Sequence, residues 1–151
     1  MNLINGFYGR WVFLSNFYPS VLTWEGITYP TAEHAYNAGK TASRALRYVI
    51  AEAADPAKAK KLGRNLELRP DWERARYQVM RDVLRAKFAC NPLRVEALLS
   101  TGDAVLIESQ SVGDRWHDQH WGDCYCGRPA CVEAGANHLG WLLMELRANL
   151  G

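Results

Sequence analysis

The sequence predicts an α+β fold, in which a single helix-rich domain carries a few short strands. Apolar residues recur every three or four positions over most of the chain, whereas only a few short segments have strand character. The 151 residues fit one domain, residues 1–151, and are enough to bury a core. A hydrophobic fraction of 48% and a charged fraction of 23% are typical of a soluble globular protein and argue against disorder.

The first thirty residues predict extended structure and are rich in aromatic side chains. Trp11–Phe17 reads as an extended segment that ends in a Ser-Asn-Phe-Tyr-Pro turn. Val21–Trp24 and Ile27–Tyr29 flank Glu25-Gly26, which predicts a β-hairpin. The aromatic residues of this region are Trp11, Phe13, Phe17, Tyr18, Trp24 and Tyr29. Most of them fit a core, and some also fit a pocket that stacks a nucleobase.

Capping residues and apolar periodicity predict the helices that follow. Thr31 caps a first helix, Ser43 caps a second over Arg44–Ala53, and Asp55-Pro56 starts a third that Gly63 ends. A long helix from about Pro70 to Ala89 has a buried face formed by Tyr77, Met80, Val83, Leu84 and Phe88. The remaining expected elements are a helix from Asn91-Pro92 to near Gly102, a strand over Val105–Glu108, and a helix from His138 to Leu150. Residues 109–135 form an irregular segment, and loops of that length are usually functional.

Charge and hydropathy exclude several classes of protein. The formal net charge of +2 is too small for non-specific nucleic-acid binding by electrostatics alone. The N-terminal residues lack the basic and apolar regions of a signal peptide, and no apolar run approaches the ~20 residues of a membrane span. We therefore expect a cytoplasmic protein without a membrane partner, whose cysteines are reduced unless they bind metal. The oligomeric state stays open.

Residues 31–40 place a carboxylate and an amine on one side of the first predicted helix. Glu33 and Lys40 are seven residues apart, which corresponds to about 10 Å at a rise of ~1.5 Å per residue. Tyr36 lies between them on the same face. That spacing is too long for an ion pair and suits holding a ligand, although a solvated helix face has the same pattern.

Lys87 falls in the middle of the apolar face of the long helix, between Val83 and Leu84 on the helical wheel. A lysine in this position extends its charge to solvent, finds a partner or loses its proton. Burial would lower its pKa and make the amine a nucleophile or a Schiff-base former. The alternative is an aliphatic stem whose charge meets the C-terminal end of the helix dipole.

The irregular segment contains a second group of polar and aromatic residues, His117-Asp118-Gln119-His120-Trp121-Gly122-Asp123. Two carboxylates flank a Trp-Gly step, where glycine lets the backbone approach a ligand and tryptophan offers a stacking surface.

Three cysteines follow this group at once. The spacing is Cys124-x-Cys126-x4-Cys131, with His117 and His120 upstream and His138 downstream. Three thiolates and an imidazole could hold a structural zinc, but the spacing is not that of paired Cys-x-x-Cys knuckles. Three reduced thiols are the alternative, and Cys90 fits a packing role at a helix end. We assign no metal to the functional site, and we find neither a glycine-rich phosphate loop nor a nucleophile triad.

Taken together, segments from about Leu14 to Leu150 resemble the YbiA-like family, also called NADAR for its association with NAD and ADP-ribose. The matching segments are Leu14-Ser15-Asn16-Phe17, Thr31-Ala32-Glu33-His34, Lys40, Gly63-Arg64, Trp72, Met80, Leu84-Arg85-Ala86-Lys87-Phe88, Glu108, Asp118-x-x-Trp121-Gly122-Asp123, and Gly135-x-Asn137-x-Leu139-Gly140-x-Leu142-Leu143-Met144-Glu145-Leu146-Arg147. The cysteine-bearing stretch departs from the bacterial YbiA type, which is shorter and glycine-rich there.

The resemblance implies a YbiA-like fold and an N-glycosidase that needs no cofactor. Family members cleave the base–ribose-phosphate bond of early riboflavin-pathway intermediates, or remove ADP-ribose from guanine in DNA, with a Schiff-base lysine proposed for the latter group. We expect removal of ADP-ribose from modified guanine, so the partner is an ADP-ribosylated nucleobase or nucleotide, including DNA that carries one. Hydrolysis of riboflavin intermediates is the alternative. Two further alternatives are not enzymes: a non-catalytic module that binds ADP-ribose, and a zinc-stabilised nucleic-acid binder, which the small net charge disfavours.

The resemblance and the residues together indicate roles. N-glycoside cleavage passes through an oxocarbenium-like state, which a carboxylate stabilises while a donor protonates the leaving nitrogen. Glu33 is the expected carboxylate and Asp123 the second acid/base, while Lys40 or Lys87 serves as the amine. Arg64 is the expected phosphate clamp, and Trp121 with Phe17 or Trp72 would enclose the base. The full expected substrate-binding set is Ser15, Asn16, Phe17, Arg64, Trp72, Glu108, Asp118, Trp121, Gly122 and Asn137.

Overall fold

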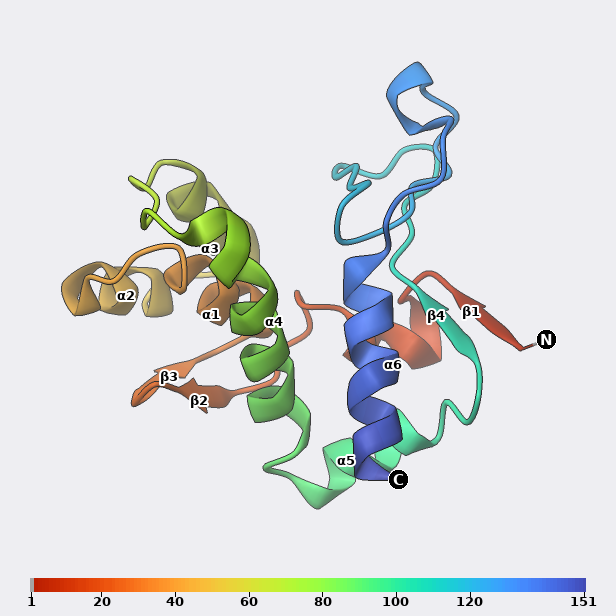
Figure 1. The fold of residues 1–151 in the computed structure, drawn as a ribbon, viewed down its shortest axis with the longest axis horizontal. Coiled ribbons are helices and arrows are strands. Elements are labelled where there is room, and N and C mark those ends of the chain that lie inside the picture. The colour runs from red at the N-terminus through yellow and green to blue at the C-terminus, as the bar shows by residue number, and fades with distance from the viewer. Residues whose placement is uncertain (1) are drawn as a thin grey trace. The chain divides into compact units, whose positions relative to one another are not determined.

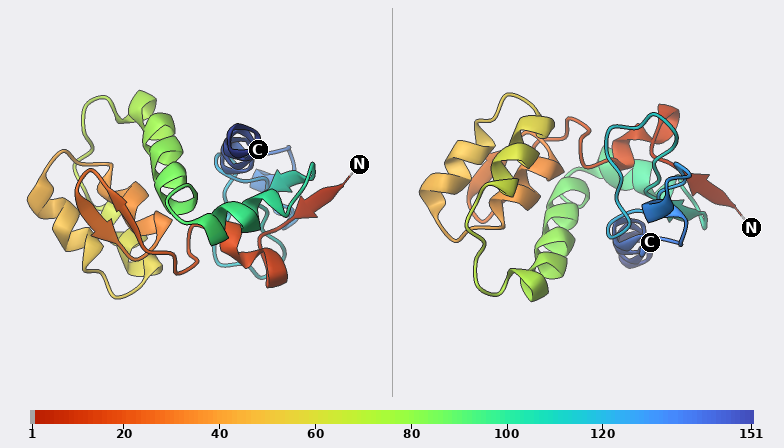
Figure 2. Two further views of the ribbon diagram at one scale, coloured as in Figure 1. Left: turned by 90° about the horizontal axis from the view of Figure 1, so that it is seen from below. Right: turned by 90° about the horizontal axis from the view of Figure 1, so that it is seen from above.

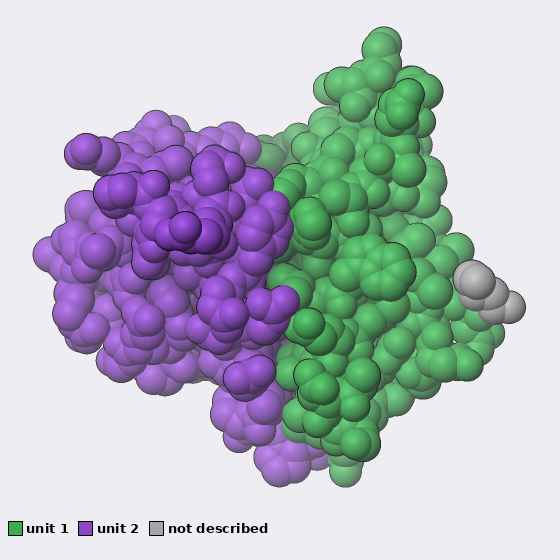
Figure 3. Space-filling view, in the orientation of Figure 1, with its two compact units in different colours: residues 1–15, 95–151 green, residues 16–94 purple. Residues whose placement is uncertain are grey.

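The computed structural model describes residues 2–151 and confirms the α+β fold class (Figure 1). The chain divides into two compact units (Figure 3). Unit 1 contains residues 1–15 and 95–151, and unit 2 contains residues 16–94. The division falls inside the helix α5 (Pro92–Leu99). No helix among residues 2–151 is long and apolar enough to cross a membrane.

Unit 2 begins with the predicted hairpin, formed by β2 (Leu22–Trp24) and β3 (Ile27–Tyr29). Glu25 and Gly26 both have positive φ angles, 48° and 80°, as a two-residue turn between twisted antiparallel strands requires. The strands alternate between buried and exposed residues. Their buried side chains therefore lie on one face, which contributes to the core of this unit.

Four helices follow, and side-chain caps start the first three. They are α1 (Ala32–Ala38), α2 (Arg44–Ala51), α3 (Pro56–Arg64) and α4 (Trp72–Phe88). Thr31, Ser43 and Asp55 each accept a hydrogen bond from a backbone N–H three residues ahead, as predicted from their residue types. Helix α1 packs against α2, α3 and α4. Six of its seven residues are buried, which makes α1 the centre of the unit.

Unit 1 is built on a parallel pair of short strands, β1 (Leu3–Asn5) and β4 (Val105–Ile107), which lie side by side in Figures 1 and 2. Leu3 pairs with Val105 and Asn5 with Ile107. Helix α6 (His138–Leu150) packs against β4 and buries Leu139, Leu143 and Leu146, as its apolar periodicity predicts. Between β4 and α6 the one regular element is the short 3-10 helix η2 (Pro129–Cys131).

The extended segment predicted over Trp11–Phe17 is wrong. Residues Gly9–Leu14 instead form a 3-10 helix, η1. Backbone hydrogen bonds from Trp11 N to Tyr8 O (2.9 Å) and from Ser15 N to Val12 O (3.0 Å) close its turns. Gly9, with φ of 55°, supplies the left-handed conformation at its start. Alternating aromatic residues thus have strand-like composition but a local turn geometry.

Candidate active site

The start of helix α1 is fixed by two residues of the Thr-Ala-Glu-His segment. Thr31 Oγ1 accepts from His34 N (3.1 Å) and also lies 2.7 Å from His34 Nδ1. His34 Nε2 lies 3.0 Å from the carbonyl oxygen of Ala53. Because a carbonyl only accepts, Nε2 donates and Nδ1 accepts from the Thr31 hydroxyl. Burial lowers the pKa of His34 below its ordinary value of 6.5, while the hydrogen bond to Ala53 and the negative charge of Asp55 oppose the shift. A neutral imidazole therefore locks α1 in place.

Glu33 stands in the first turn of α1 and is held by two asparagines. Its backbone N donates to Asn16 O (3.0 Å). Asn37 Nδ2 donates to Glu33 O (2.8 Å) and to the carboxylate oxygen Oε1 (3.0 Å). Asn37 is buried, whereas Glu33 is only partly buried. The Glu33 carboxylate is therefore oriented by Asn37 and remains partly exposed.

Helix α3 packs against the asparagine that orients Glu33. A Cβ added at Gly63 would overlap Asn37 Oδ1 and press on the rest of that side chain. Asn37 Oδ1 is buried and has no hydrogen-bond partner among the described residues. The glycine at this position is therefore required by the close approach of α3 to Asn37 rather than by its backbone angles.

The helix expected over residues 31–40 ends at Ala38, so Lys40 lies two residues beyond it, after the capping residue Gly39, and is half-buried. Its Nζ lies 5.7 Å from the centre of the Tyr36 ring. Burial lowers the pKa of Lys40 below its ordinary value of 10.5; the negative charge of Glu33 opposes this shift, and the positive charges of Lys60 and Arg64 add to it. The charges that act on Lys40 are therefore one carboxylate, Glu33, and two cations, Lys60 and Arg64.

The aromatic residues of unit 2 divide into buried and accessible ones. Tyr36 and Trp72 are 8% and 5% exposed and pack against each other, with ring centroids 5.3 Å apart. Phe17 is partly exposed, and Lys60 Nζ lies 5.9 Å from its ring centre. Of the two rings expected to enclose a base from this unit, Phe17 is accessible and Trp72 belongs to the core.

Lys87 is 1% exposed, so its ammonium does not reach solvent along the apolar face of α4. Its Nζ lies 5.0 Å from the centre of the Phe88 ring. Arg94 Nη1 donates to the carbonyls of Lys87 (2.9 Å) and Val21 (2.7 Å), which ties the end of α4 to the hairpin. The two candidate lysines therefore differ in exposure, since Lys87 is fully buried and Lys40 is half-buried.

Among the unit 1 residues, Asn137 connects three segments. It has a left-handed backbone (φ 54°) at the start of α6. Its Nδ2 donates to Leu106 O (2.9 Å), its Oδ1 accepts from Glu108 N (3.0 Å), and its backbone N donates to Gly122 O (3.1 Å). The strand β4, the Trp-Gly loop and α6 thus meet at one buried amide, which positions Glu108 at the end of the strand.

The loop that contains Trp121 is shaped by Asp118 and Gly122. Asp118 Oδ1 accepts from the backbone N of both His120 (2.9 Å) and Trp121 (2.7 Å), which is an Asx-turn. A Cβ at Gly122 would overlap the carbonyl oxygen of Glu108. The glycine therefore lets this loop lie directly on the residue that follows β4.

Asp123 uses both carboxylate oxygens to hold the loop. Oδ1 accepts from Gly135 N (2.8 Å) and Oδ2 accepts from the Tyr125 hydroxyl (2.9 Å). The hydrogen bond to Asp123 raises the pKa of Tyr125. The backbone N of Asp123 donates to Glu108 O (2.7 Å). Glu108, Asp118, Trp121, Gly122, Asp123 and Asn137 are thus brought together within unit 1, while Glu33, Lys40 and Arg64 are brought together within unit 2.

Comparison with known proteins identifies the family of the chain. A model of the NADAR domain matches residues 6–151. The chain belongs to the NADAR family. It is similar to the N-glycosidase YbiA of Escherichia coli strain K12, with 38% identity over 138 residues that cover 90% of this chain and 79% of that protein. A riboflavin biosynthesis protein of Vibrio vulnificus is 37% identical over 91% of this chain, but the match covers only 35% of that longer protein.

The fold of this NADAR chain also has a solved counterpart. The NMR structure of E. coli YbiA matches with a TM-score of 0.79 and 36% identity, over 99% of this chain and 84% of that one. The relatives named N-glycosidases are hydrolases acting on N-glycosyl bonds. The recognised family and the α+β fold class are both confirmed.

Two residues of the site were not predicted from the sequence. Asn37 is four residues beyond Glu33 and is thus within reach on the helix, a spacing that would have identified it. Lys60 lies on the same helix as Arg64, one turn earlier, and a search for further cations on that helix face would have found it. Ser15 and Asn16 were predicted; Ser15 ends η1, and Asn16 Nδ2 donates to Met80 Sδ (3.5 Å).

Proposed function

We propose that this NADAR chain is an N-glycosidase that hydrolyses the bond between a nucleobase and an ADP-ribose or ribose-phosphate. One observation carries this proposal: the Glu33 carboxylate is oriented by Asn37 beside Lys40, whose pKa also responds to Lys60 and Arg64. A carboxylate stabilises the positive charge that grows at the anomeric carbon, and several cations bind phosphate. The names of the relatives support the same reaction class.

The hydrolysis needs few groups. The N-glycosyl bond breaks with its electrons moving to the base nitrogen, which takes a proton, and water adds to the anomeric carbon and loses one. Glu33 is suited to stabilise the oxocarbenium-like state or to accept the proton from water. Asn16 Oδ1, a buried acceptor with no hydrogen-bond partner in the described part of the chain, is suited to accept from a ribose hydroxyl.

A Schiff-base route places an amine in the reaction. The amine attacks the anomeric carbon of a ring-opened sugar, the base amine leaves with a proton, and water then hydrolyses the imine. Lys40 is the better candidate for this amine than Lys87, because it is partly exposed whereas Lys87 is 1% exposed. Burial lowers the pKa of Lys40, so that more of it is neutral near pH 7 than in an ordinary lysine. Arg64 and Lys60 would then bind phosphate.

We propose ADP-ribosylated guanine as the substrate, including guanine in DNA. Lys40, Lys60 and Arg64 are three separate cationic side chains, and the two linked phosphates of ADP-ribose could contact more of them than one phosphate could. The cysteine-bearing stretch beside Asp123 gives unit 1 a loop that bacterial YbiA proteins are expected to lack. A second candidate, hydrolysis of early riboflavin intermediates, is favoured by the names of relatives such as the V. vulnificus protein.

A cleavage assay that offers both substrates tests the proposal. We expect release of ADP-ribose from ADP-ribosyl-guanine DNA and a slower reaction with the riboflavin intermediates. Glu33→Gln should reduce kcat by ~10²–10⁴-fold and retain binding, whereas the control Glu52→Gln, at an exposed position after α2, should leave kcat unchanged. Absence of cleavage of either substrate would contradict the proposal, and binding without turnover would favour a non-catalytic ADP-ribose-binding module.

A further inference from the structure

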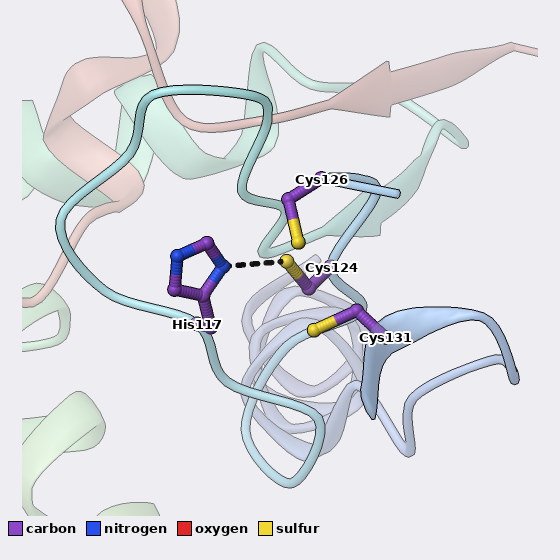
Figure 4. Close-up of side chains that lie close together, drawn as sticks. All are labelled: His117, Cys124, Cys126 and Cys131. Carbon is purple, nitrogen blue, oxygen red and sulfur yellow. Dashed lines mark hydrogen bonds between the residues drawn. The ribbon is translucent and has the colours of Figure 1, made fainter. Parts of the chain in front are cut away.

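Three cysteines and one histidine of unit 1 converge on one point that the proposed reaction does not use. The ligand-type atoms of His117, Cys124, Cys126 and Cys131 all lie within 4.8 Å of one another. Figure 4 shows the three sulfur atoms pointing toward each other, with the imidazole of His117 facing Cys124. His117 Nδ1 lies 3.3 Å from Cys124 Sγ. These residues form the sulfur cluster of unit 1.

The structure selects one imidazole from the three that the sequence places near these cysteines. The rings of His120 and His138 lie 4.6 Å apart, and both contact Trp121, at 5.0 Å and 6.0 Å. They belong to an aromatic group of their own. His117 alone joins the three thiols among the described residues, which gives a set of three sulfurs and one nitrogen.

This donor set fits zinc. Three thiolates and an imidazole are a common structural zinc set, and with Zn–S bonds of ~2.3 Å a tetrahedron has ligand atoms about 3.8 Å apart. The sulfur cluster therefore needs only a small contraction around the ion. Four protein ligands fill the tetrahedron and leave no position for a water molecule or substrate, so the site is structural rather than catalytic.

The sulfur cluster lies in an irregular segment that a bound ion would stabilise. Cys124, Cys126 and Cys131 are 2%, 9% and 8% exposed and form a buried group of their own, in a segment whose one regular element is η2. Such a segment has little core with which to hold itself. Gln119 links two parts of this segment, since its Oε1 accepts from Cys124 N and its Nε2 donates to Glu133 O, both at 2.6 Å.

We propose that His117, Cys124, Cys126 and Cys131 bind one Zn²⁺, which closes the loop that carries Asp118 and Asp123. On binding, each thiol loses its proton to solvent and becomes a thiolate ligand, while the imidazole binds in its neutral form, and no redox step is involved. Asp123 is directly bonded to Cys124 in the chain and accepts from Gly135 N beyond Cys131. The ion therefore joins the loop through its four ligands, and Asp123 joins the same loop through its hydrogen bond to Gly135. This inference does not depend on the proposed function.

The experiment measures metal in the 151-residue chain, purified without a histidine tag from cells grown with added zinc. Inductively coupled plasma mass spectrometry should find one zinc per chain and no iron, and a mercurial thiol reagent should release it. Cys124→Ser and Cys131→Ser should lose the stoichiometric zinc. Cys90→Ser, an exposed cysteine outside the cluster, and His120→Ala should retain it.

Two further measurements keep the result interpretable if the cysteine variants fold poorly. His117→Cys keeps four ligands and should retain zinc, and the wild-type chain reconstituted with Co²⁺ should show thiolate-to-cobalt charge-transfer absorption that changes in this variant. The proposal is overturned if the wild-type chain carries no zinc and takes up no Co²⁺ in this form. It is equally overturned if a disulfide between two of the three cysteines accounts for their thiols, or if the ligand variants hold as much zinc as Cys90→Ser.

Discussion

Asn37 Nδ2 lies 3.0 Å from Glu33 Oε1 and 2.8 Å from the carbonyl oxygen of the same residue. The side-chain amide of Asn37 therefore donates to both the backbone and the side chain of Glu33, one helical turn earlier. A hydrogen bond to the charged form of a carboxylate stabilises it and restricts its rotation. Asn37 is consequently a positioning residue for Glu33, and its own place is set by helix α3.

Replacing Asn37 by alanine should reduce kcat by about 10-fold and leave KM nearly unchanged, because a carboxylate that rotates is less often aligned with the reacting carbon. Steady-state kinetics measure kcat and KM separately.

The matched control is Asn149→Ala, which removes an exposed asparagine near the end of α6 and should change neither kcat nor KM. If the loss of activity in Asn37→Ala comes from a raised KM, or from a smaller folded fraction in a urea titration, the positioning role is contradicted.

Gly63→Ala should destabilise the protein although alanine favours helices. The gain in helix propensity is about 1 kcal/mol, but the new Cβ would overlap Asn37 Oδ1, and overpacking of this kind costs about 1–3 kcal/mol. We expect a net decrease in the free energy of unfolding together with reduced kcat. Denaturant titration of this variant and of Lys61→Ala, an exposed position on the same helix, measures the difference. A stabilised Gly63→Ala with full activity would show that Asn37 moves without consequence.

Local signals in the sequence were sufficient for much of the fold. Thr31, Ser43 and Asp55 act within three residues of themselves, and Glu25-Gly26 forms a turn by its own backbone preferences. The strand β1 was not predicted, because its partner β4 lies about a hundred residues away, Leu3 pairing with Val105. A three-residue strand acquires its identity from that partner, and no local pattern contains it.

The candidate site shows the same division between local and distant information. The helical wheel placed Lys87 on an apolar face, and the residue is 1% exposed. The choice of His117 over His120 and His138 required the path of the loop. One of the two hydrogen bonds to the Asp123 carboxylate comes from Gly135, twelve residues further along an irregular segment. Spacing alone could not reveal these contacts, because irregular chain has no fixed period.

The pKa of Lys40 should respond in opposite directions to two substitutions. Lys60→Met removes a positive charge and should raise the pKa, while Glu33→Gln removes a negative charge and should lower it further below 10.5. Carbon NMR of lysine labelled at Cε measures the titration. Lys58→Met, an exposed position on α3, is the control and should have little effect.

If Lys40 supplies the reacting amine, activity rises as pH increases through its pKa, since only the neutral amine attacks. The midpoint of the pH–rate profile should then move upward in Lys60→Met by the amount seen in the NMR titration. A midpoint that stays in place while the NMR pKa moves would exclude Lys40 as the nucleophile.

His34 should make the stability of the protein sensitive to mild acid. Its pKa is lowered in the folded state, so the unfolded chain binds more protons between that pKa and 6.5. The free energy of unfolding therefore decreases as pH falls through 6.5 toward the folded pKa. His34→Gln should remove this dependence, at a cost of ~1–3 kcal/mol for the altered buried hydrogen bonds. Urea titrations at pH 7.5 and 5.5 measure how the free energy of unfolding changes with pH. An equal change in the wild type and in His34→Gln would contradict the role of His34 in this dependence.

Asp123 offers a test that separates positioning from proton transfer. Both carboxylate oxygens already accept hydrogen bonds, from Gly135 N and from Tyr125, so we expect its main task to be holding the loop. Asp123→Asn retains an oxygen that can accept from Gly135 N, whereas Asp123→Ala does not. Asp123→Asn should therefore keep the Gly135 amide protected from hydrogen exchange and keep most of the activity. Asp123→Ala should lose both, with a stability loss of ~1–3 kcal/mol.

The opposite pattern assigns Asp123 to the chemistry. If Asp123→Asn keeps Gly135 protected but loses activity by ~10²-fold or more, the ionised oxygen transfers a proton or stabilises charge. Asp103→Asn, in an exposed turn of unit 1, controls for the loss of one negative charge. Tyr125→Phe removes only the contact to Oδ2 and should have a smaller effect on Gly135 exchange than Asp123→Ala, because the hydrogen bond that spans the cysteine-bearing segment remains.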